Sequence, residues 1–342
     1  MRQRLSSVDI AKGIGIILVV AGHNRAIKEV APLLSAGIYL FHMPLFFFLS
    51  GLLTPTPLQS HQLMSKCMGL IRPYLTGVII FLPLQLLQKD HPSNHPLIEK
   101  ILWGSGNAIY NTPLWFLTCL ITGYAVLWLI GKIRLTRQMP ISLLVALLGI
   151  GLTYWALDGQ HGFELLPKDS LDRPLGAPFN IDLALMTAAF LLLGSKLLPW
   201  IQNPPRSTWL ALVFVVSSAT FVGLMWQCDP RLDLNYRLIQ QWPSALACCF
   251  AGIGSTLSLS MLLGRHGPSL TRPLEYFGRN TLIILVFHSP IQNQLIRFIS
   301  KHIDLTLGMA FFISLCICFV LTWVSEKLIN PRAHLRKFFY AR

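Results

Sequence analysis

Long apolar stretches recur along the whole chain and are separated by short polar segments. A helix of about 20 apolar residues crosses the hydrocarbon core of a bilayer. Ten stretches approach this length, which predicts an all-α integral membrane protein, a polytopic bundle of about ten transmembrane helices. The expected spans cover residues 8–26, 33–53, 67–87, 113–130, 141–157, 181–198, 209–226, 242–263, 281–298 and 305–329.

The polar connections between these spans are too short for a separate soluble domain, which typically needs about 50 residues or more. The longest connections cover residues 88–112, 158–180 and 228–241. We therefore expect a single membrane-embedded domain over residues 1–342, with no appended soluble domain.

The distribution of charge predicts the orientation of the bundle, because cytoplasmic segments retain Lys and Arg during insertion. If the first span starts in the cytoplasm, most of the 28 Lys and Arg residues fall inside and most of the 14 Asp and Glu residues fall outside. Both termini are then cytoplasmic.

Composition agrees with a membrane protein and excludes two other classes. The chain is 53% hydrophobic and 12% charged, whereas soluble domains carry about 25% charged residues. Its net charge of +14 would suggest a nucleic-acid partner in a soluble protein, but here the topology accounts for it. The seven cysteines show no metal-binding spacing, so we expect no metal site and no tightly bound cofactor.

Polar residues inside apolar spans are costly and are therefore candidates for function. In the first span, Lys12 and His23 are eleven positions apart, which places them on one helix face at depths that differ by about 16 Å. Asp9 lies near the same face. Alternatively, Asp9 and Lys12 form an interfacial pair, Lys12 extends its amine to the membrane surface, and His23 is an interface residue.

The second span contributes His42 at a depth comparable to that of His23. Histidine titrates near neutral pH and is suited to proton abstraction, so two histidines on adjacent helices predict acid–base chemistry. Alternatively, both form only helix contacts. Ser50 and Gly51 favour close helix approach, and a nucleophilic role for Ser50 is the weaker interpretation.

Other polar and aromatic residues leave two interpretations open. His288, in the ninth span, is either a site residue or a buried donor between helices. Trp115 belongs either to an interfacial aromatic belt or to a sugar-stacking site. The acidic residues of the outer loops, including Asp182, Asp229 and Asp233, are expected to form a solvated surface.

Several motifs resemble the acyltransferase 3 family, in particular its subgroup related to fucose 4-O-acetylase. The first motif is Asp9-Ile-Ala-Lys-Gly-Ile followed by His23, and the second is the run Phe41-His42-Met43-Pro44 that continues through three phenylalanines to Ser50-Gly51. Weaker matches follow in order at residues 72–74, 114–117, 277–282 and 287–288. The resemblance therefore covers most of the chain.

This resemblance implies a membrane enzyme that moves an acyl group, usually acetyl from acetyl-CoA, to a sugar hydroxyl of a surface or lipid-linked glycan. It implies a multi-pass protein of the bacterial-type cytoplasmic (inner) membrane. The family's motif of a basic residue, ten residues and a histidine falls on Lys12 and His23, with Lys where many members have Arg. The change preserves the charge but loses the two-pronged guanidinium.

The chemistry of acyl-CoA suggests roles for further residues. Its phosphates favour cations at the inner face, for which we expect Lys12, Arg72 and Arg279, with Asp9 beside them. His23 is expected to act as general base toward the acceptor hydroxyl. His42 is expected to act as second base, orienting group or oxyanion donor.

Asn280 either orients CoA or caps the ninth span. The acceptor side is expected to include Trp115, His288 and Ser50.

A different class of function is also compatible with the sequence. A ten-span bundle with intramembrane His, Asp and Lys is also typical of a secondary transporter, or of a flippase for a lipid-linked sugar. A sensor or scaffold without chemistry is a weaker third interpretation. No internal repeat supports the transporter, and the cation in the first span suits an anionic soluble donor.

Overall fold

The computed structural model describes residues 5–87, 97–106, 108–133, 138–158, 176–265 and 268–339, and these are largely helical. The long helices are α1 (Ser6–Gly22), α3 (Pro32–Leu52), α4 (Ser60–Leu87), α6 (Trp115–Ile130), α7 (Met139–Asp158), α8 (Ala184–Gln202), α9 (Ser207–Cys228), α10 (Trp242–Leu263), α12 (Thr281–Ile299) and α13 (Leu307–Val324). The shorter helical elements are α2 (Arg25–Val30), α5 (Leu97–Trp103), η1 (Thr112–Leu114), η4 (Pro178–Leu183), α11 (Pro268–Arg279), η5 (Ser325–Ile329) and α14 (Ala333–Phe339). Strands β1 (Arg231–Asp233) and β2 (Leu238–Gln240) form an antiparallel hairpin in which Leu232 pairs with Ile239.

Nine helices in the described part of the chain are long and apolar enough to cross a membrane. Each corresponds to one of the predicted spans, so the prediction of a multi-pass helical membrane protein is confirmed. The first predicted span is shorter than expected, because α1 ends at Gly22 and α2 begins at Arg25. Asn24 stabilises this break by accepting a hydrogen bond from the backbone N–H of Ala26 at 3.0 Å, which caps α2.

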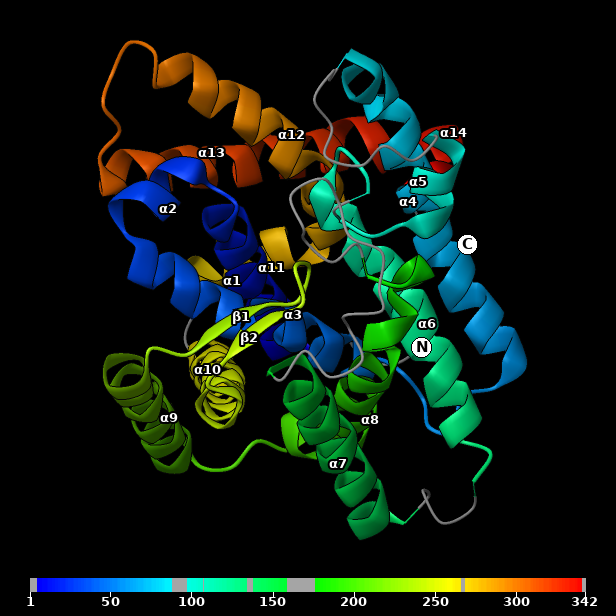
Figure 1. The fold of residues 1–342 in the computed structure, drawn as a ribbon. Coiled ribbons are helices and arrows are strands. Elements are labelled where there is room, and N and C mark those ends of the chain that lie inside the picture. Colours follow the sequence, from blue (N-terminus) through cyan, green and yellow to red (C-terminus); the bar gives the residue numbers. More distant parts are fainter. Residues whose placement is uncertain are drawn as a thin grey trace.

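Helices α1 and α3 form the centre of the bundle. In Figure 1, α12 and α13 lie above them, α4 and α6 to the right, α7 and α8 below, and α9 and α10 at the lower left. The largest fully buried side chains include Ile10 and Ile16 of α1 and Phe47 and Phe48 of α3. The two central helices therefore carry residues that are shielded by the surrounding helices.

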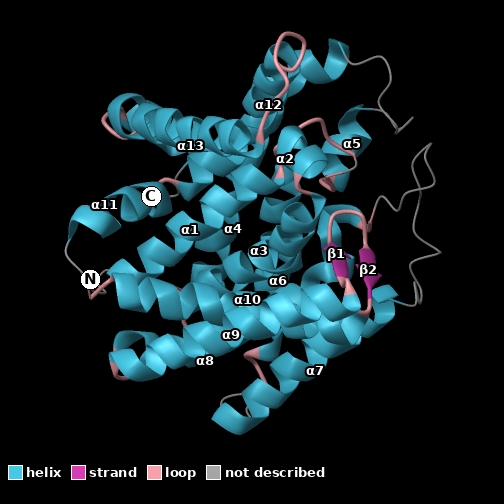
Figure 2. Ribbon diagram, turned by 90° about the vertical axis from the view of Figure 1, so that its left-hand side faces the viewer, coloured by secondary structure: helices cyan, strands magenta, loops and turns pink. Residues whose placement is uncertain are grey.

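The bundle has two distinct ends. Figure 2 shows the β1–β2 hairpin at its right-hand side, which we call the hairpin end. Helix α11 lies at the opposite side, which we call the α11 end.

The outward faces of the bundle are apolar. On α9, which packs against α10, exposed residues include Trp209, Val215 and Trp226. Apolar surfaces of this extent are rare on soluble monomers, whereas hydrocarbon is a suitable solvent for them.

Two helix pairs approach each other through glycines. A Cβ atom on Gly51 of α3 would lie 2.2 Å from the backbone oxygen of Leu191, and one on Gly194 of α8 would lie 2.1 Å from that of Phe48. Likewise, a Cβ on Gly278 of α11 would lie 1.9 Å from the backbone oxygen of Asp9 in α1. The prediction that Gly51 permits close helix approach is confirmed, because any side chain there would push α3 and α8 apart.

Gly51→Ala should lower the free energy of unfolding by about 1–3 kcal/mol, the usual cost of overpacking a well-packed contact. The matched control is Gly223→Ala on α9, where an added Cβ meets nothing within 4 Å. Thermal unfolding in detergent compares the two variants with the parent protein. Equal melting temperatures for both variants would contradict the close contact between α3 and α8.

Candidate functional site

A cavity of about 330 Å³ opens at the hairpin end of the bundle. Its walls come from the end of α1, from α2, α3, η1, α6 and α12, and from the turn between β1 and β2. We call it the histidine cavity, because His23 and His42 both line it. Elements from distant parts of the chain therefore meet at this one position.

Three histidines gather beside the cavity. The ring of His23 lies 6.4 Å from that of His42 and 5.2 Å from that of His288, measured between ring centroids. His42 and His288 are buried, whereas His23 is partly exposed. The structure therefore brings together three histidines that the sequence singled out separately.

Each of these histidines makes the same local hydrogen bond. Nδ1 lies 2.9 Å from the oxygen of Val19 in His23, 2.8 Å from that of Ile38 in His42, and 2.8 Å from that of Ile284 in His288. A carbonyl oxygen only accepts, so Nδ1 carries the hydrogen. A neutral imidazole in this tautomer presents the lone pair of Nε2, which is the form that a general base requires.

Helix α12 contains Pro290 two residues after His288. Proline has no N–H, so the carbonyl of Val286 loses its usual helical partner. Asn111, just before η1, replaces that partner by donating its Nδ2 to the oxygen of Val286 at 2.7 Å. This bond ties the segment that carries Trp115 to the helix that carries His288.

The mouth of the cavity is rich in cations. Arg25 and Lys28 of α2 and Arg297 of α12 all line it, together with the acidic side chain of Asp233. Lys28 donates its Nζ to the hydroxyl of Tyr39 at 3.0 Å. Burial lowers the pKa of Lys28 from its usual value and raises the pKa of Asp233 to about 6.

Asp233 also shapes the turn of the hairpin. Its Oδ1 accepts hydrogen bonds from the backbone N–H groups of Asn235 at 3.0 Å and Tyr236 at 3.2 Å. Both of these residues line the histidine cavity. The acid therefore holds the turn in a shape that forms one wall of the cavity.

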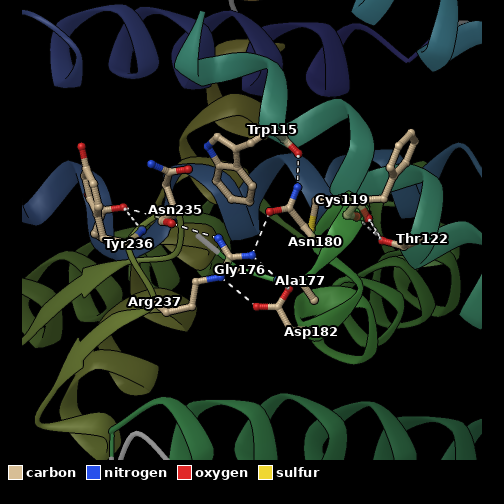
Figure 3. Close-up of polar contacts among 12 residues, drawn as sticks. Trp115, Cys119, Thr122, Gly176, Ala177, Asn180, Asp182, Asn235, Tyr236 and Arg237 are labelled. Atoms are coloured by element: carbon tan, nitrogen blue, oxygen red, sulfur yellow. Dashed lines mark hydrogen bonds and ion pairs between the residues drawn. The ribbon is translucent and has the colours of Figure 1, made fainter. Parts of the chain in front are cut away.

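A buried ion pair fastens the hairpin to the rest of the bundle (Figure 3). Arg237, whose side chain is 0% exposed, donates Nε to Oδ2 of Asp182 at 2.8 Å and Nη2 to Oδ1 at 3.0 Å. Its Nη1 also donates to the backbone oxygen of Asn235 at 2.9 Å. The guanidinium thus links the cavity-lining turn to η4.

Asn180 extends this contact to α6. Its Oδ1 accepts from Nη2 of Arg237 at 2.8 Å, and its Nδ2 donates to Oγ1 of Thr118 at 2.8 Å and to the oxygen of Trp115 at 3.2 Å (Figure 3). Because Trp115 lines the histidine cavity, one hydrogen-bonded network supports two of its walls.

The expectation of a solvated acidic surface was wrong for Asp182 and Asp233. Asp182 is only 9% exposed and pairs with Arg237, and Asp233 belongs to the cavity. Asp229 is mainly exposed, with an ion pair to Arg231 at 2.7 Å. The difference arises because the hairpin folds back against α3 and buries part of its own loop.

The residues expected to bind the acyl donor lie away from the histidines. Arg279 lines a second, more open cavity of about 560 Å³ at the α11 end, together with Arg272, Glu275 and Tyr276. Its Nε lies 3.8 Å from Oδ2 of Asp9. We call this the α11 cavity.

Lys12 and Arg72 line neither the histidine cavity nor the α11 cavity. Lys12 lies in α1, and His23 follows the last residue of that helix, about 16 Å away along the axis. Of these three expected donor-site residues, the α11 cavity is therefore lined by Arg279 and not by Lys12 or Arg72.

Asn280 precedes α12 but makes no capping hydrogen bond with its side chain. Its Nδ2 donates to Oε1 of Glu326 at 2.9 Å, and its Oδ1 accepts from Oγ of Ser325 at 2.6 Å. The capping interpretation is therefore wrong, since Asn280 instead joins α12 to η5.

Trp115 lines the histidine cavity, and the ring of His288 lies beside that of His23; their role on the acceptor side stays a prediction. Ser50 does not line the cavity; it is eight residues after His42, or about 12 Å along α3. Within the described ranges, no group of three His, Cys, Asp or Glu residues is arranged to hold a metal ion.

Sequence reasoning missed the polar residues that surround the histidines. Arg25 and Lys28 follow His23 closely, so their position next to a candidate base was a usable signal. Tyr39 precedes His42 by three residues, which places the two on one helix face. For Asp233 and Arg297 no local signal existed, because each reaches the cavity only through the folding of a distant segment.

Comparison with known proteins identifies one family. Residues 5–325 match a family model described as an acyltransferase domain. No curated protein and no solved structure matches the chain.

Proposed function

Because this chain belongs to the acyltransferase 3 family, we propose that it transfers an acyl group, expected to be acetyl, from acyl-CoA to a hydroxyl of a cell-surface or lipid-linked glycan. The observation that carries this proposal is the tautomer of His23, whose hydrogen-bonded Nδ1 leaves Nε2 as the basic atom at a cavity. The closer likeness to the subgroup related to fucose 4-O-acetylase stays a prediction.

In the proposed reaction, Nε2 of His23 takes the proton of the acceptor hydroxyl as its oxygen attacks the thioester carbon. A new carbon–oxygen bond forms and the carbon–sulfur bond breaks. The CoA thiolate leaves and receives the proton from His23, which regenerates the neutral base. His42, at the same cavity, is proposed as a second base or as the group that orients the hydroxyl.

The donor is proposed to bind from the α11 end. Lys and Arg are concentrated on the predicted cytoplasmic side, which supports an orientation with α11 inside and the hairpin outside. Arg272 and Arg279 of the α11 cavity suit the phosphates of acyl-CoA. Asp9, which lies 3.8 Å from Arg279, precedes His23 by about 21 Å along the helix axis, so the thin pantetheine arm must extend into the bundle to present its thioester.

The test uses purified protein in liposomes with isotope-labelled acetyl-CoA and glycans isolated from cells that lack the gene. We expect release of free CoA and, by mass spectrometry, the gain of one labelled acetyl group on a sugar. If neither product forms with any glycan fraction, the proposal is wrong. Protein-dependent counterflow of a sugar in the same liposomes would then favour the transporter.

A further inference from the structure

Three cations converge on the histidine cavity from two separate elements. Arg25 and Lys28 belong to α2 and Arg297 to the last turn of α12, more than 260 positions later in the chain. Asp233 is the acidic residue in the cavity lining. The described lining therefore carries an excess of positive charge next to His23.

Neither Arg25 nor Arg297 forms an ion pair within the described part of the chain. By contrast, Arg231, Arg237 and Arg279 each pair with a carboxylate. Lys28 donates its Nζ to the hydroxyl of Tyr39 and is attracted by Asp233, so three lining cations face one lining carboxylate. Arg25, Lys28 and Arg297 are all exposed at the cavity, so their charged groups are accessible to an anion that enters it.

The helix dipole explains only part of this arrangement. Lys28 and Arg297 lie in the last turns of their helices, where a positive charge is favoured. Arg25 begins α2, a position where the dipole gives a cation no benefit. The helix dipole therefore does not account for the position of Arg25 in the cavity lining.

The remaining lining suits a sugar. Asn235 and Asn293 offer amide donors and acceptors, while Trp115 and Tyr236 offer aromatic surfaces. A volume of about 330 Å³ is at the small end of the range for ligand pockets, so the cavity fits a short segment of glycan. Neutral hydroxyls would be satisfied by these groups and would leave the cations without a partner.

We propose that the acceptor is an anionic glycan, whose phosphate or carboxylate is bound by Arg25, Lys28 and Arg297 while a neighbouring hydroxyl faces His23. This inference rests on the proposed function and deepens it by naming the substrate class. Arginine binds both kinds of anion through paired N–H donors. A lipid-linked sugar phosphate and a glycan containing a uronic acid share this chemistry.

The first arm of the test measures activity. Purified full-length protein in liposomes receives labelled acetyl-CoA and one of three acceptors: a methyl hexoside, the matching methyl hexuronoside, or the hexose 1-phosphate. We expect kcat/KM to be at least about 10-fold higher for one or both anionic acceptors than for the neutral one. The two anionic acceptors distinguish carboxylate from phosphate.

The variant Arg25→Gln/Arg297→Gln should remove this preference, lowering kcat/KM for the anionic acceptor by about 10- to 100-fold and for the neutral acceptor by less than about 2-fold. Arg25→Lys/Arg297→Lys should retain part of the preference, because the charge remains. The matched control is Arg231→Gln, because Arg231 lies in the β1–β2 hairpin beside the cavity but does not line it. This variant should behave as the parent protein.

The second arm measures binding without turnover. Titration with the hexose 1-phosphate and the hexuronoside is followed by calorimetry, for the parent protein and for the glutamine double variant. We expect binding that weakens as salt is raised and that is lost in the double variant.

Equal binding of neutral and anionic sugars, or no effect of the double variant, would overturn the anionic acceptor. If anions bind at the arginines but no acyl group is transferred to any acceptor, the proposed function fails while the anion site stands. If an acyl group is transferred to the neutral hexoside alone, the proposed function stands and the anionic acceptor is overturned.

Discussion

Acyl transfer by His23→Asn should be about 10²- to 10⁴-fold slower than by the parent protein, the usual contribution of a positioned general base. Asparagine places an amide N–H near the position of Nδ1, so the bond to Val19 is retained while the basic Nε2 is removed. The substitution therefore tests the chemistry rather than the local fold. The measurement is the initial rate of label transfer from acetyl-CoA to glycan.

The neighbouring histidines provide an internal comparison. His42→Asn should reduce the rate by a smaller factor if His42 orients the hydroxyl, and by a similar factor if it also accepts the proton. The matched control is His302→Asn, because His302 is exposed and does not line the cavity. An unchanged rate for His23→Asn would eliminate His23 as the base.

The second large effect is expected at the buried ion pair of the hairpin. Arg237→Ala should lower the free energy of unfolding by about 3–5 kcal/mol, because it leaves the carboxylate of Asp182 buried without its partner. The same change should abolish acyl transfer in the folded fraction, since the turn that carries Asn235 is then no longer held. Thermal unfolding in detergent and the transfer assay measure the two effects.

Two further variants distinguish this ion pair from an ordinary surface contact. Arg231→Ala removes a more exposed pair on the same hairpin and should cost about 0–1 kcal/mol. Arg237→Met/Asp182→Leu removes both charges and should recover much of the stability. If the melting temperature of Arg237→Ala is no lower than that of Arg231→Ala, the ion pair between Arg237 and Asp182 does not hold the hairpin in place.

The helical bundle was predictable because each span is defined by residues that are adjacent in sequence. Around 20 apolar residues in a row require a membrane or a core regardless of what else the chain does. The exception was the first span, where the polar side chain of Asn24 forms a local cap that ends one helix and begins another. The mean hydropathy of residues 8–26 does not reveal such a break, because one polar residue changes the mean only slightly.

The candidate site was predictable in its separate members but not as an assembly. The sequence by itself identified His23, His42, His288 and Trp115, because a polar or aromatic residue in an apolar span stands out against its neighbours. It could not reveal that Asp182 and Asp233 are shielded, because both occur in loops whose local composition is polar. Their environment depends on where the hairpin folds.

The sequence therefore determined the class of protein, its helices and the chemistry of its strongest candidates, all of which depend on local periodicity and composition. Only the tertiary structure decided which charges surround His23 and which ion pair holds the wall beside it. Lys28 and Asp233, or Asp182 and Arg237, are far apart along the chain. Their interactions depend on short distances in space, which no pattern of neighbouring residues encodes.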